Sequence, residues 1–459
     1  MKKITFLMLV IIFGFGKLST VKANSEYEKV AMEMLKSMVS GDFEKAAINF
    51  DVYVAKALPP QKLEFVWKQL QTAYGNFVSI SDFSKTEKVG NRTLIINHII
   101  FEKDSLRSNI TLDKNKETDK IEVAGFYVLP ITPEAKDAEY IDAEYVVKSK
   151  FEEISITLPP DSLLQGKLTI PTNLPANQKV PCIVLVHGSG PQDLDETVYN
   201  INKPFRDIAY GLSSNGIAVL RYNKRTLFPQ KLDIANLTLN EETVFDAVEA
   251  VNFLRKNYPD KIGKIYVLGH SLGGYAMPRI ANLSKNADGF ICLAGFARNF
   301  GDVLEDQFEY LYELNIQDTE TQETKDDLDS LKRIDMKKIK RFQMKNFDEN
   351  TPVDSLPLNM PAKYLLDLVN YEPVKEFSKE QRPVLFLQGK RDYQVTVEDF
   401  NLWKAGLGKK QNCKFVLFDN LNHLLQAGTG KSKPSEYNEK KNVDKQVIDE
   451  IVNWIKSNK

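Results

Sequence analysis

Cysteine and histidine are both scarce in this chain of 459 residues, which has three cysteines and four histidines. Cys182, Cys292 and Cys413 each lie in an apolar run, and an odd number of such residues argues for free core thiols and against a disulfide framework. The metal-binding spacings CxxC and HExxH do not occur in the sequence. We therefore expect no metal ion, and the sequence implies no organic cofactor.

An excess of charge of one sign is also missing, since 61 Lys and Arg face 62 Asp and Glu. Without a net charge that produces a strong electrostatic field, we expect neither nucleic acid nor an anionic membrane surface as a partner. Beyond the N-terminus no apolar run is long enough to span a bilayer, so we expect no stable membrane insertion.

The N-terminal residues 1–23 read MKKITFLMLVIIFGFGKLSTVKA. Two lysines, an apolar run from Ile4 to Phe15 and small residues ending at Ala23 are typical of a cleaved secretory signal peptide. We expect cleavage after Ala23 and export to the periplasm or the extracellular space. The alternative is an uncleaved membrane anchor.

Two segments that differ in their pattern of apolar and polar residues follow the signal peptide. Residues 25–128 combine helical patterns with strand-like runs at 93–102, 107–113 and 121–129, which predicts a small α+β accessory domain. Residues 129–147, rich in Pro, Ala, Asp and Glu, are the predicted linker. From 148 to 459, short runs that are apolar on both faces alternate with helical patterns, which predicts a doubly wound α/β domain with a mostly parallel sheet.

An insertion at about residues 296–380 separates the apolar runs 290–295 and 384–389. Its many charged residues at helical spacing predict solvated helices. These helices could also form a cap over the sheet edge at which α/β proteins bind ligands. The apolar runs 308–314 and 364–369 are candidates for the inner face of such a cap.

The segment IYVLGHSLGGYA, residues 265–276, places Ser271 between a strand-like run and three glycines. It contains the pattern Gly-x-Ser-x-Gly after a strand and before a helical pattern. Glycines on both sides permit a turn so tight that the serine hydroxyl is pushed out at the sheet edge. The N-terminus of the next helix then offers N–H groups to a developing oxyanion. Ser271 is therefore the candidate nucleophile.

Five motifs follow one another in the order typical of one protein family: HGSGPQDLDE (187–196), RYNKRT (221–226), GHSLGG (269–274), QGKRDYQV (388–395) and NHLL (422–425). With them, residues 150–459 resemble the α/β-hydrolase superfamily, and more narrowly the bacterial esterases described as serine-aminopeptidase-like or dienelactone-hydrolase-like. Asn223 and Thr226 depart from the Asp and Gly that relatives commonly carry, which affects the local turn. Residues 25–128 resemble a small domain of unknown function that precedes hydrolase domains in exported bacterial proteins and is thought to adopt a cone-like, nuclear-transport-factor-type fold.

A serine nucleophile needs a base, and His423 is the candidate. His98 lies in the small domain, and His270 is turned away by the tight turn. Family members use a histidine at the position of His187 to shape its loop. His423 follows the last strand-like run, the position from which this fold supplies its base.

Asp392 is the candidate acid, because it follows a strand and gives the chain order Ser, Asp, His. Asp419 also ends a strand and is the alternative acid. The family pattern assigns the oxyanion hole to the backbone N–H groups of Leu272 and Ser189.

Charged residues crowd the loops after two strands: Asp193, Asp195 and Glu196 in one, and Arg221, Lys224 and Arg225 in the other. They either brace these loops in pairs or contact a charged substrate, and the sequence leaves both interpretations open.

The resemblance implies an exported serine hydrolase that cleaves small-molecule carboxylic esters through an acyl-enzyme, with the triad Ser271, His423 and Asp392. An exopeptidase or amidase, or an acyltransferase, could use the same triad. A catalytically silent binding protein is the alternative from another class. The accessory domain would serve docking or dimerisation.

Overall fold

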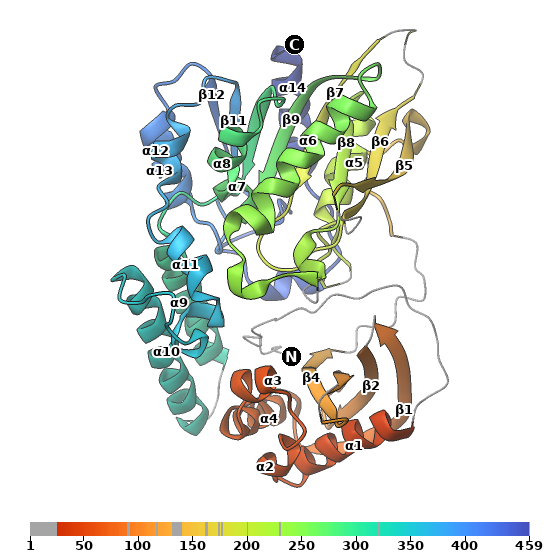
Figure 1. The fold of residues 1–459 in the computed structure, drawn as a ribbon, viewed down its shortest axis with the longest axis vertical. Helices are drawn as coiled ribbons and strands as arrows, with labels where there is room; N and C mark the ends of the chain where they lie inside the picture. Colours follow the sequence, from red (N-terminus) through yellow and green to blue (C-terminus); the bar gives the residue numbers. More distant parts are fainter. Residues whose placement is uncertain are drawn as a thin grey trace. The chain divides into compact units, whose positions relative to one another are not determined.

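The computed structural model describes residues 25–458, apart from residues 90–91, 116–117, 131–139, 161–163, 173–174, 176–177, 200, 229–230 and 319–321. The predicted signal peptide, residues 1–23, lies outside the described residues, as does part of the predicted linker. The chain forms two compact units (Figure 1). In the described part of the chain, no helix is both long and apolar enough to cross a membrane.

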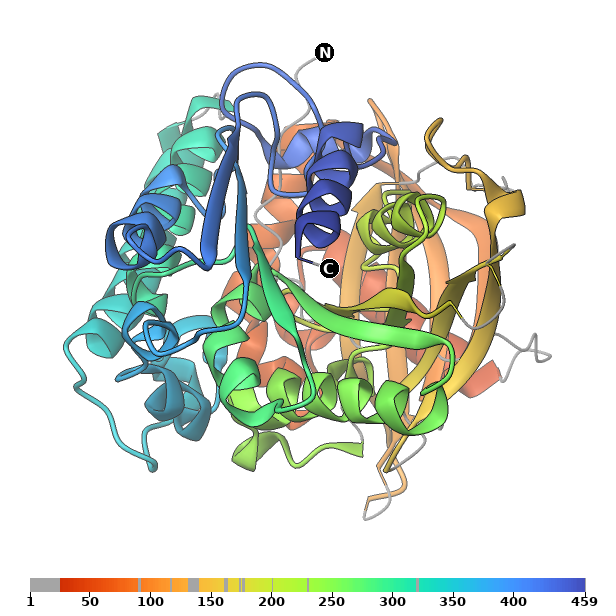
Figure 2. The ribbon, with the colours of Figure 1, turned by 90° about the horizontal axis from the view of Figure 1, so that it is seen from above.

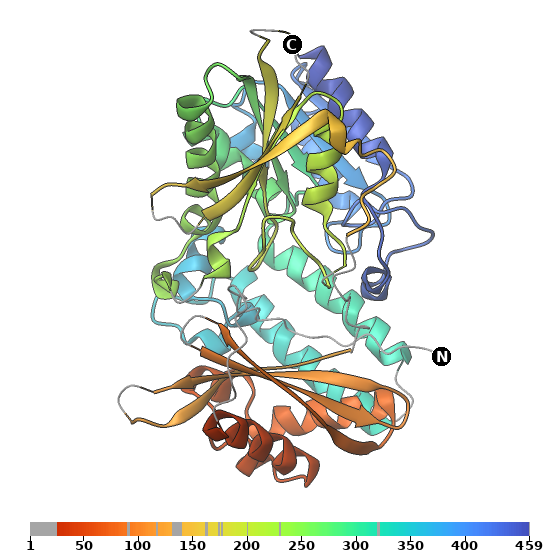
Figure 3. The ribbon, with the colours of Figure 1, turned by 90° about the vertical axis from the view of Figure 1, so that its right-hand side faces the viewer.

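The first unit is a four-stranded antiparallel sheet with strand order β1-β2-β3-β4. Helices preceding the sheet cover one of its faces, as Figure 3 shows, and Leu35, Trp67 and Ile110 lie in the core between the two layers. The elements are α1 (Ser25–Val39), α2 (Phe43–Ala46), α3 (Val52–Ala57), α4 (Pro60–Tyr74), β1 (Phe77–Val89), β2 (Arg92–Phe101), β3 (Ser105–Lys114) and β4 (Ile121–Pro130).

The second unit is built on an eight-stranded sheet with order β12-β11-β10-β9-β7-β8-β6-β5. Its strands are β5 (Phe151–Leu158), β6 (Leu164–Pro171), β7 (Val180–Val186), β8 (Ala218–Tyr222), β9 (Ile262–His270), β10 (Gly289–Leu293), β11 (Val384–Gly389) and β12 (Cys413–Phe418). The strands from β7 to β12 pair in parallel, while β5 and β6 are antiparallel at one edge. The predicted doubly wound, mostly parallel sheet is confirmed.

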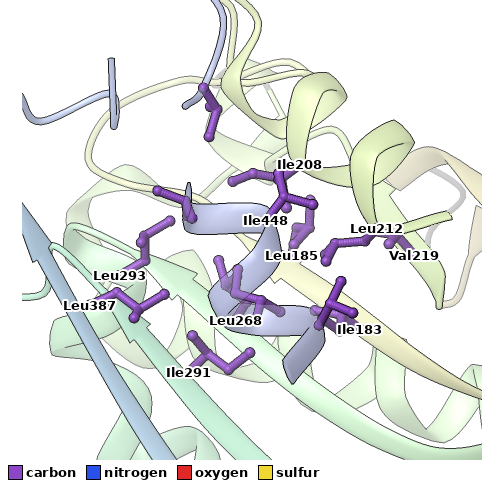
Figure 4. Packing of buried hydrophobic residues seen from close by; sticks show 14 of the residues in the cluster. Ile183, Leu185, Ile208, Leu212, Val219, Leu268, Ile291, Leu293, Leu387 and Ile448 are labelled. Carbon is purple, nitrogen blue, oxygen red and sulfur yellow. The ribbon is translucent and has the colours of Figure 1, made fainter. Parts of the chain in front are cut away.

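Helices cover both faces of this sheet (Figure 2). On one face, Ile208 and Leu212 of α5 (Pro204–Ser213) and Ile448 of α14 (Lys445–Ser457) pack against sheet residues such as Leu185 and Leu268, as Figure 4 shows. The opposite face carries α6 (Phe245–Asn257), α8 (Met277–Leu283) and α13 (Val397–Leu407). Since the central strands β7 to β11 are buried on both faces, their sequences read as continuous apolar runs.

The insertion between β10 and β11 contains, within the described residues, the helices α9 (Phe300–Asp318), α10 (Gln322–Gln343), α11 (Ala362–Leu368) and α12 (Pro373–Phe377). Its helical character agrees with the spacing of its charged residues. The remaining elements are α7 (Leu272–Tyr275), the π turn Asn240–Val244, and the 3-10 turns Lys148–Lys150, Arg225–Leu227, Ile234–Asn236, Val353–Ser355, Pro357–Asn359 and Pro434–Asn438.

Candidate active site

Ser271 is the single residue between the end of β9 at His270 and the start of α7 at Leu272. Its backbone angles are φ 52° and ψ −114°, a conformation that residues with a side chain rarely adopt. Two hydrogen bonds hold it there: the Ser271 N–H donates to the Leu293 carbonyl (2.9 Å) and the Ser271 carbonyl accepts from the Tyr275 N–H (3.0 Å). Strand, strained residue and helix together form the sharp turn that the sequence pattern predicts.

Two glycines make close contacts around this turn, and Gly269 leaves no room for a side chain. A Cβ atom on Gly269 would lie 2.3 Å from the carbonyl carbon of Gly273, a distance too short for any side chain. A Cβ atom on Gly188 would lie 3.2 Å from the Cβ of Ser271. The loop after β7 therefore passes directly beside Ser271.

His423 and Asp392 come from different loops and are joined by a hydrogen bond of 2.7 Å between His423 Nδ1 and Asp392 Oδ2. Asp392 follows β11, and its other oxygen accepts from the N–H groups of Gln394 (2.8 Å) and Val395 (3.0 Å). The Gln388 side chain, whose part the sequence analysis missed, donates to Asp392 Oδ2 (3.1 Å). Both His423 and Asp392 are buried.

The alternative acid, Asp419, lies elsewhere. Its side chain is 82% exposed and pairs with Lys390. Among the two predicted acids, it is Asp392 that the structure brings against His423.

His270 links the loop of His423 to the turn of Ser271. Its Nε2 lies 3.0 Å from the His423 carbonyl oxygen, and the two imidazole rings are 4.7 Å apart. Because His270 directly precedes Ser271, the predicted nucleophile and the predicted base lie at the same edge of the sheet. Within the described residues, the N–H groups of Leu272 and Ser189 donate to no protein acceptor.

Glu196 is a buried carboxylate at the centre of this site to which the sequence analysis gave no definite role. Its Oε1 accepts from the Gly188 N–H (2.7 Å), and its Oε2 lies 2.9 Å from His270 Nδ1. Burial alone would lower the pKa of His270, but the Glu196 charge and hydrogen bonds outweigh it, so that the pKa is raised. Burial would raise the pKa of Glu196, but His270 reverses this, so that the pKa is lowered. Both shifts favour the charged forms of His270 and Glu196.

The two other histidines take no part in this arrangement. Burial lowers the pKa of His187 to about 4, so its ring is neutral at pH 7, and its Nε2 lies 2.9 Å from the Asp193 carbonyl oxygen. This contact agrees with the loop-shaping role that the family resemblance implies. His98 lies in β2 of the first unit, as expected.

The charged residues of the neighbouring loops are paired with protein groups. Arg221 donates to Asp195 (2.9 Å) and to Glu153 (2.8 Å), and Arg225 pairs with Asp246. These contacts favour the interpretation that the charges brace the loops. In the part of the chain that the structure describes, no group of three or more His, Cys, Asp or Glu side chains could hold a metal ion.

The insertion reaches the two loops that carry His423 and Asp392. Tyr310 and Leu311 of α9 pack against an apolar cluster that includes Tyr393 and Leu424, the chain neighbours of Asp392 and His423. The Tyr310 hydroxyl also donates to the Ser432 carbonyl (2.9 Å). Part of the predicted inner face of the cap therefore lies beside the site.

The parallel sheet, the tight turn at Ser271 and the position of its neighbours define the second unit as an α/β-hydrolase. Comparison with known proteins gives the family: esterase EstD of Thermotoga maritima is 38% identical over 433 residues, covering 94% of this chain and 95% of that protein. The chain belongs to the EstD family and is a carboxylic ester hydrolase.

Residues 31–120 match a family described as a protein of unknown function, DUF3887, which confirms the resemblance noted for the first domain. Among solved structures, the chain is similar to the Pyrococcus furiosus esterase PF2001, with 13% identity and a TM-score of 0.40, covering 70% of this chain and 98% of that one. It is also similar to Est1E from Butyrivibrio proteoclasticus, with 19% identity and a TM-score of 0.41, covering 66% and 98%.

Proposed function

We propose that this esterase hydrolyses small-molecule esters through an acyl-enzyme formed on Ser271. The observation that carries the proposal is the 2.7 Å contact between His423 and Asp392 at the edge where Ser271 emerges from its strained turn. The contact supports the tautomer of His423 that carries its proton on Nδ1, since a carboxylate only accepts. Nε2 is then left with a lone pair and can take the proton of a serine hydroxyl.

In the proposed reaction, Ser271 Oγ attacks the ester carbonyl while His423 Nε2 takes the proton of the Ser271 hydroxyl. The tetrahedral intermediate collapses as His423 returns this proton to the leaving alcohol, which gives the acyl-enzyme. Water, activated in the same way by His423, then releases the carboxylic acid and restores Ser271. Asp392 holds the imidazole and stabilises its positive charge in both steps.

The oxyanion of the intermediate would be held by the N–H groups of Leu272 and Ser189. Two features support this role: α7 begins at Leu272, and neither N–H group donates to a protein acceptor within the described residues. A helix start offers unpaired N–H groups that favour negative charge. Since both roles are backbone roles, the side chains of Leu272 and Ser189 matter little.

We further propose that the protein is exported, because residues 1–23 have the layout of a cleaved secretory signal peptide. The insertion would act as a cap that limits substrate size, which the packing of Tyr310 beside the site supports.

The assignment of the nucleophile is tested with Ser271→Ala, assayed on p-nitrophenyl acetate and by labelling with a fluorophosphonate probe. Loss of both hydrolysis and labelling is expected, with ester turnover reduced by roughly 10⁶-fold. Ser155→Ala, on the exposed face of the edge strand β5, is the matched control and should leave both unchanged. Labelling that persists in Ser271→Ala would contradict the proposal.

A further inference from the structure

The peptide unit between Gly188 and Ser189 is held by a lysine that the proposed reaction does not use. The Nζ atom of Lys224 donates to the Gly188 carbonyl oxygen at 2.7 Å. Lys224 belongs to the motif RYNKRT, and its side chain is only 3% exposed. Removing a lysine ammonium from water is costly, so a buried lysine needs a strong compensating interaction.

The hydrogen bond from Lys224 determines where the neighbouring N–H points. A peptide unit is planar and trans, so its C=O and N–H bonds point in opposite directions. Fixing the Gly188 carbonyl therefore fixes the Ser189 N–H, which is one of the two donors proposed for the oxyanion. The Gly188 N–H is itself held by Glu196 at 2.7 Å, so that the peptide units on both sides of Gly188 are held by buried charged groups.

Glu242 balances the charge of Lys224 and connects it to the insertion. Its carboxylate pairs with the Lys224 ammonium and accepts from the hydroxyl of Tyr364 in α11. Burial is the main cause that raises the pKa of Tyr364 well above its ordinary value, so this hydroxyl stays protonated and remains a donor. The chain of contacts runs from α11 through Glu242 and Lys224 to the loop beside Ser271.

We propose that Lys224 is a positioning residue that orients the Ser189 N–H toward the oxyanion, and that Glu242 and Tyr364 keep its ammonium in place. The Lys224 ammonium, which donates to the Gly188 carbonyl, also polarises the peptide unit and makes the Ser189 N–H a stronger donor. This proposal rests on the proposed function, because it assumes an oxyanion formed at Ser271. It predicts a loss of transition-state stabilisation with little loss of substrate binding.

The test is the double variant Lys224→Met/Glu242→Gln, which removes the lysine without leaving a buried unpaired carboxylate. On p-nitrophenyl acetate, kcat should fall by at least about tenfold while KM stays within about twofold, since a misplaced oxyanion donor costs up to 10²- to 10³-fold. An aryl trifluoromethyl ketone forms a tetrahedral adduct with a serine nucleophile, and its inhibition constant should rise by the same factor as kcat falls. A merely structural defect would not move these two quantities together.

The matched control is Arg225→Met/Asp246→Asn, which removes the adjacent ion pair between the same loop and the same helical segment. It should leave kcat and the inhibition constant unchanged. A second variant, Tyr364→Phe, removes only the hydroxyl on Glu242, and we expect kcat to fall severalfold with KM unchanged. If the double variant does not fold, Tyr364→Phe decides the question.

Wild-type kcat and inhibitor affinity in the variant that folds, or equal losses in the control, would overturn the role of Lys224. The two proposals fail in different ways. If the wild-type enzyme hydrolyses esters but the fluorophosphonate does not label Ser271, it is the proposed nucleophile that is wrong, whatever the Lys224 variants do.

Discussion

His270 and His423 are joined by a hydrogen bond of 3.0 Å between Nε2 of the first and the carbonyl oxygen of the second. On its other side, His270 Nδ1 faces a carboxylate oxygen of Glu196 at 2.9 Å. Both ring nitrogens therefore face acceptors, and a neutral imidazole carries only one N–H. The two contacts together require one more proton than a neutral histidine and an ionised glutamate provide, which agrees with the raised pKa of His270.

The Glu196–His270 pair predicts a pH-dependent contribution to stability. The pKa of His270 is raised from 6.5, so its contribution is complete below pH 6.5 and is lost as the pH rises through the raised value. The pKa of Glu196 is lowered from 4.5, so its contribution is complete above pH 4.5 and is lost as the pH falls through the lowered value. The difference in Tm between wild type and Glu196→Gln should therefore be largest between pH 4.5 and pH 6.5, where both contributions are complete.

This difference is measured by thermal unfolding from acidic to alkaline pH. The charged and titratable groups around the pair are His187, Lys224, Asp392 and His423. His187 is neutral above pH 5, since its pKa is about 4. A Tm difference that is constant over the whole pH range would contradict the ion pair.

Asp392→Asn should reduce kcat by roughly 10³- to 10⁴-fold, because an amide cannot hold the tautomer and charge of His423 as a carboxylate does. The same substitution at Asp419, whose side chain is 82% exposed, is the control and should leave kcat unchanged. Steady-state kinetics on p-nitrophenyl acetate measures both. A large effect at Asp419 with none at Asp392 would reverse the assignment of the acid.

Tyr310→Ala should shift the preference toward longer acyl chains. Its ring packs in the apolar cluster beside Tyr393 and Leu424, and its removal leaves space next to the loops of Asp392 and His423. The measurement is the ratio of kcat/KM for p-nitrophenyl octanoate to that for p-nitrophenyl acetate.

Tyr312→Ala is the matched comparison, because Tyr312 is buried and its hydroxyl donates to Asp335 of α10 at 2.8 Å. It should lower Tm, since removing a buried aromatic ring costs about 3–5 kcal/mol, without changing the chain-length ratio. An equal shift of the ratio in both variants would show that the insertion as a whole, and not the ring of Tyr310, controls the preference.

Gly188→Ala should lower kcat while the protein still folds. The added Cβ would lie 3.2 Å from Ser271 Cβ and 3.3 Å from Glu196 Oε1, so that the neighbours must move by a few tenths of an ångström. Such a shift at a nucleophile is enough to cost about 10²-fold in rate. Circular dichroism and kcat measured on the same preparation separate folding from catalysis, and unchanged kcat would contradict the close approach.

The sequence predicted most of the architecture but missed three strands. β7 to β11 were found because strands buried on both faces have continuous apolar runs. β12 is a partly buried edge strand, but its sequence is still largely apolar. β5 is an edge strand and β6 is its neighbour. In β5 only Ile156 and Leu158 are buried, while Glu152 and Glu153 are both exposed. β1 carries many polar residues and is formed by its pairing with β2. Partly buried strands with many polar residues, such as β1 and β5, give a weak sequence signal.

By itself, the sequence determined the candidate nucleophile, base and acid, because each is tied to a local pattern: a tight turn with glycines at Ser271, and loops after strands at Asp392 and His423. Only the tertiary structure shows that Asp392, and not Asp419, contacts His423, and only it gives Glu196 and Lys224 their partners. Gly188 and Lys224 are separated by a whole helix and strand, yet their atoms lie 2.7 Å apart. Local spacing indicates which residues can do chemistry, whereas contacts between distant loops depend on how the parallel strands are ordered in the sheet, which no local pattern encodes.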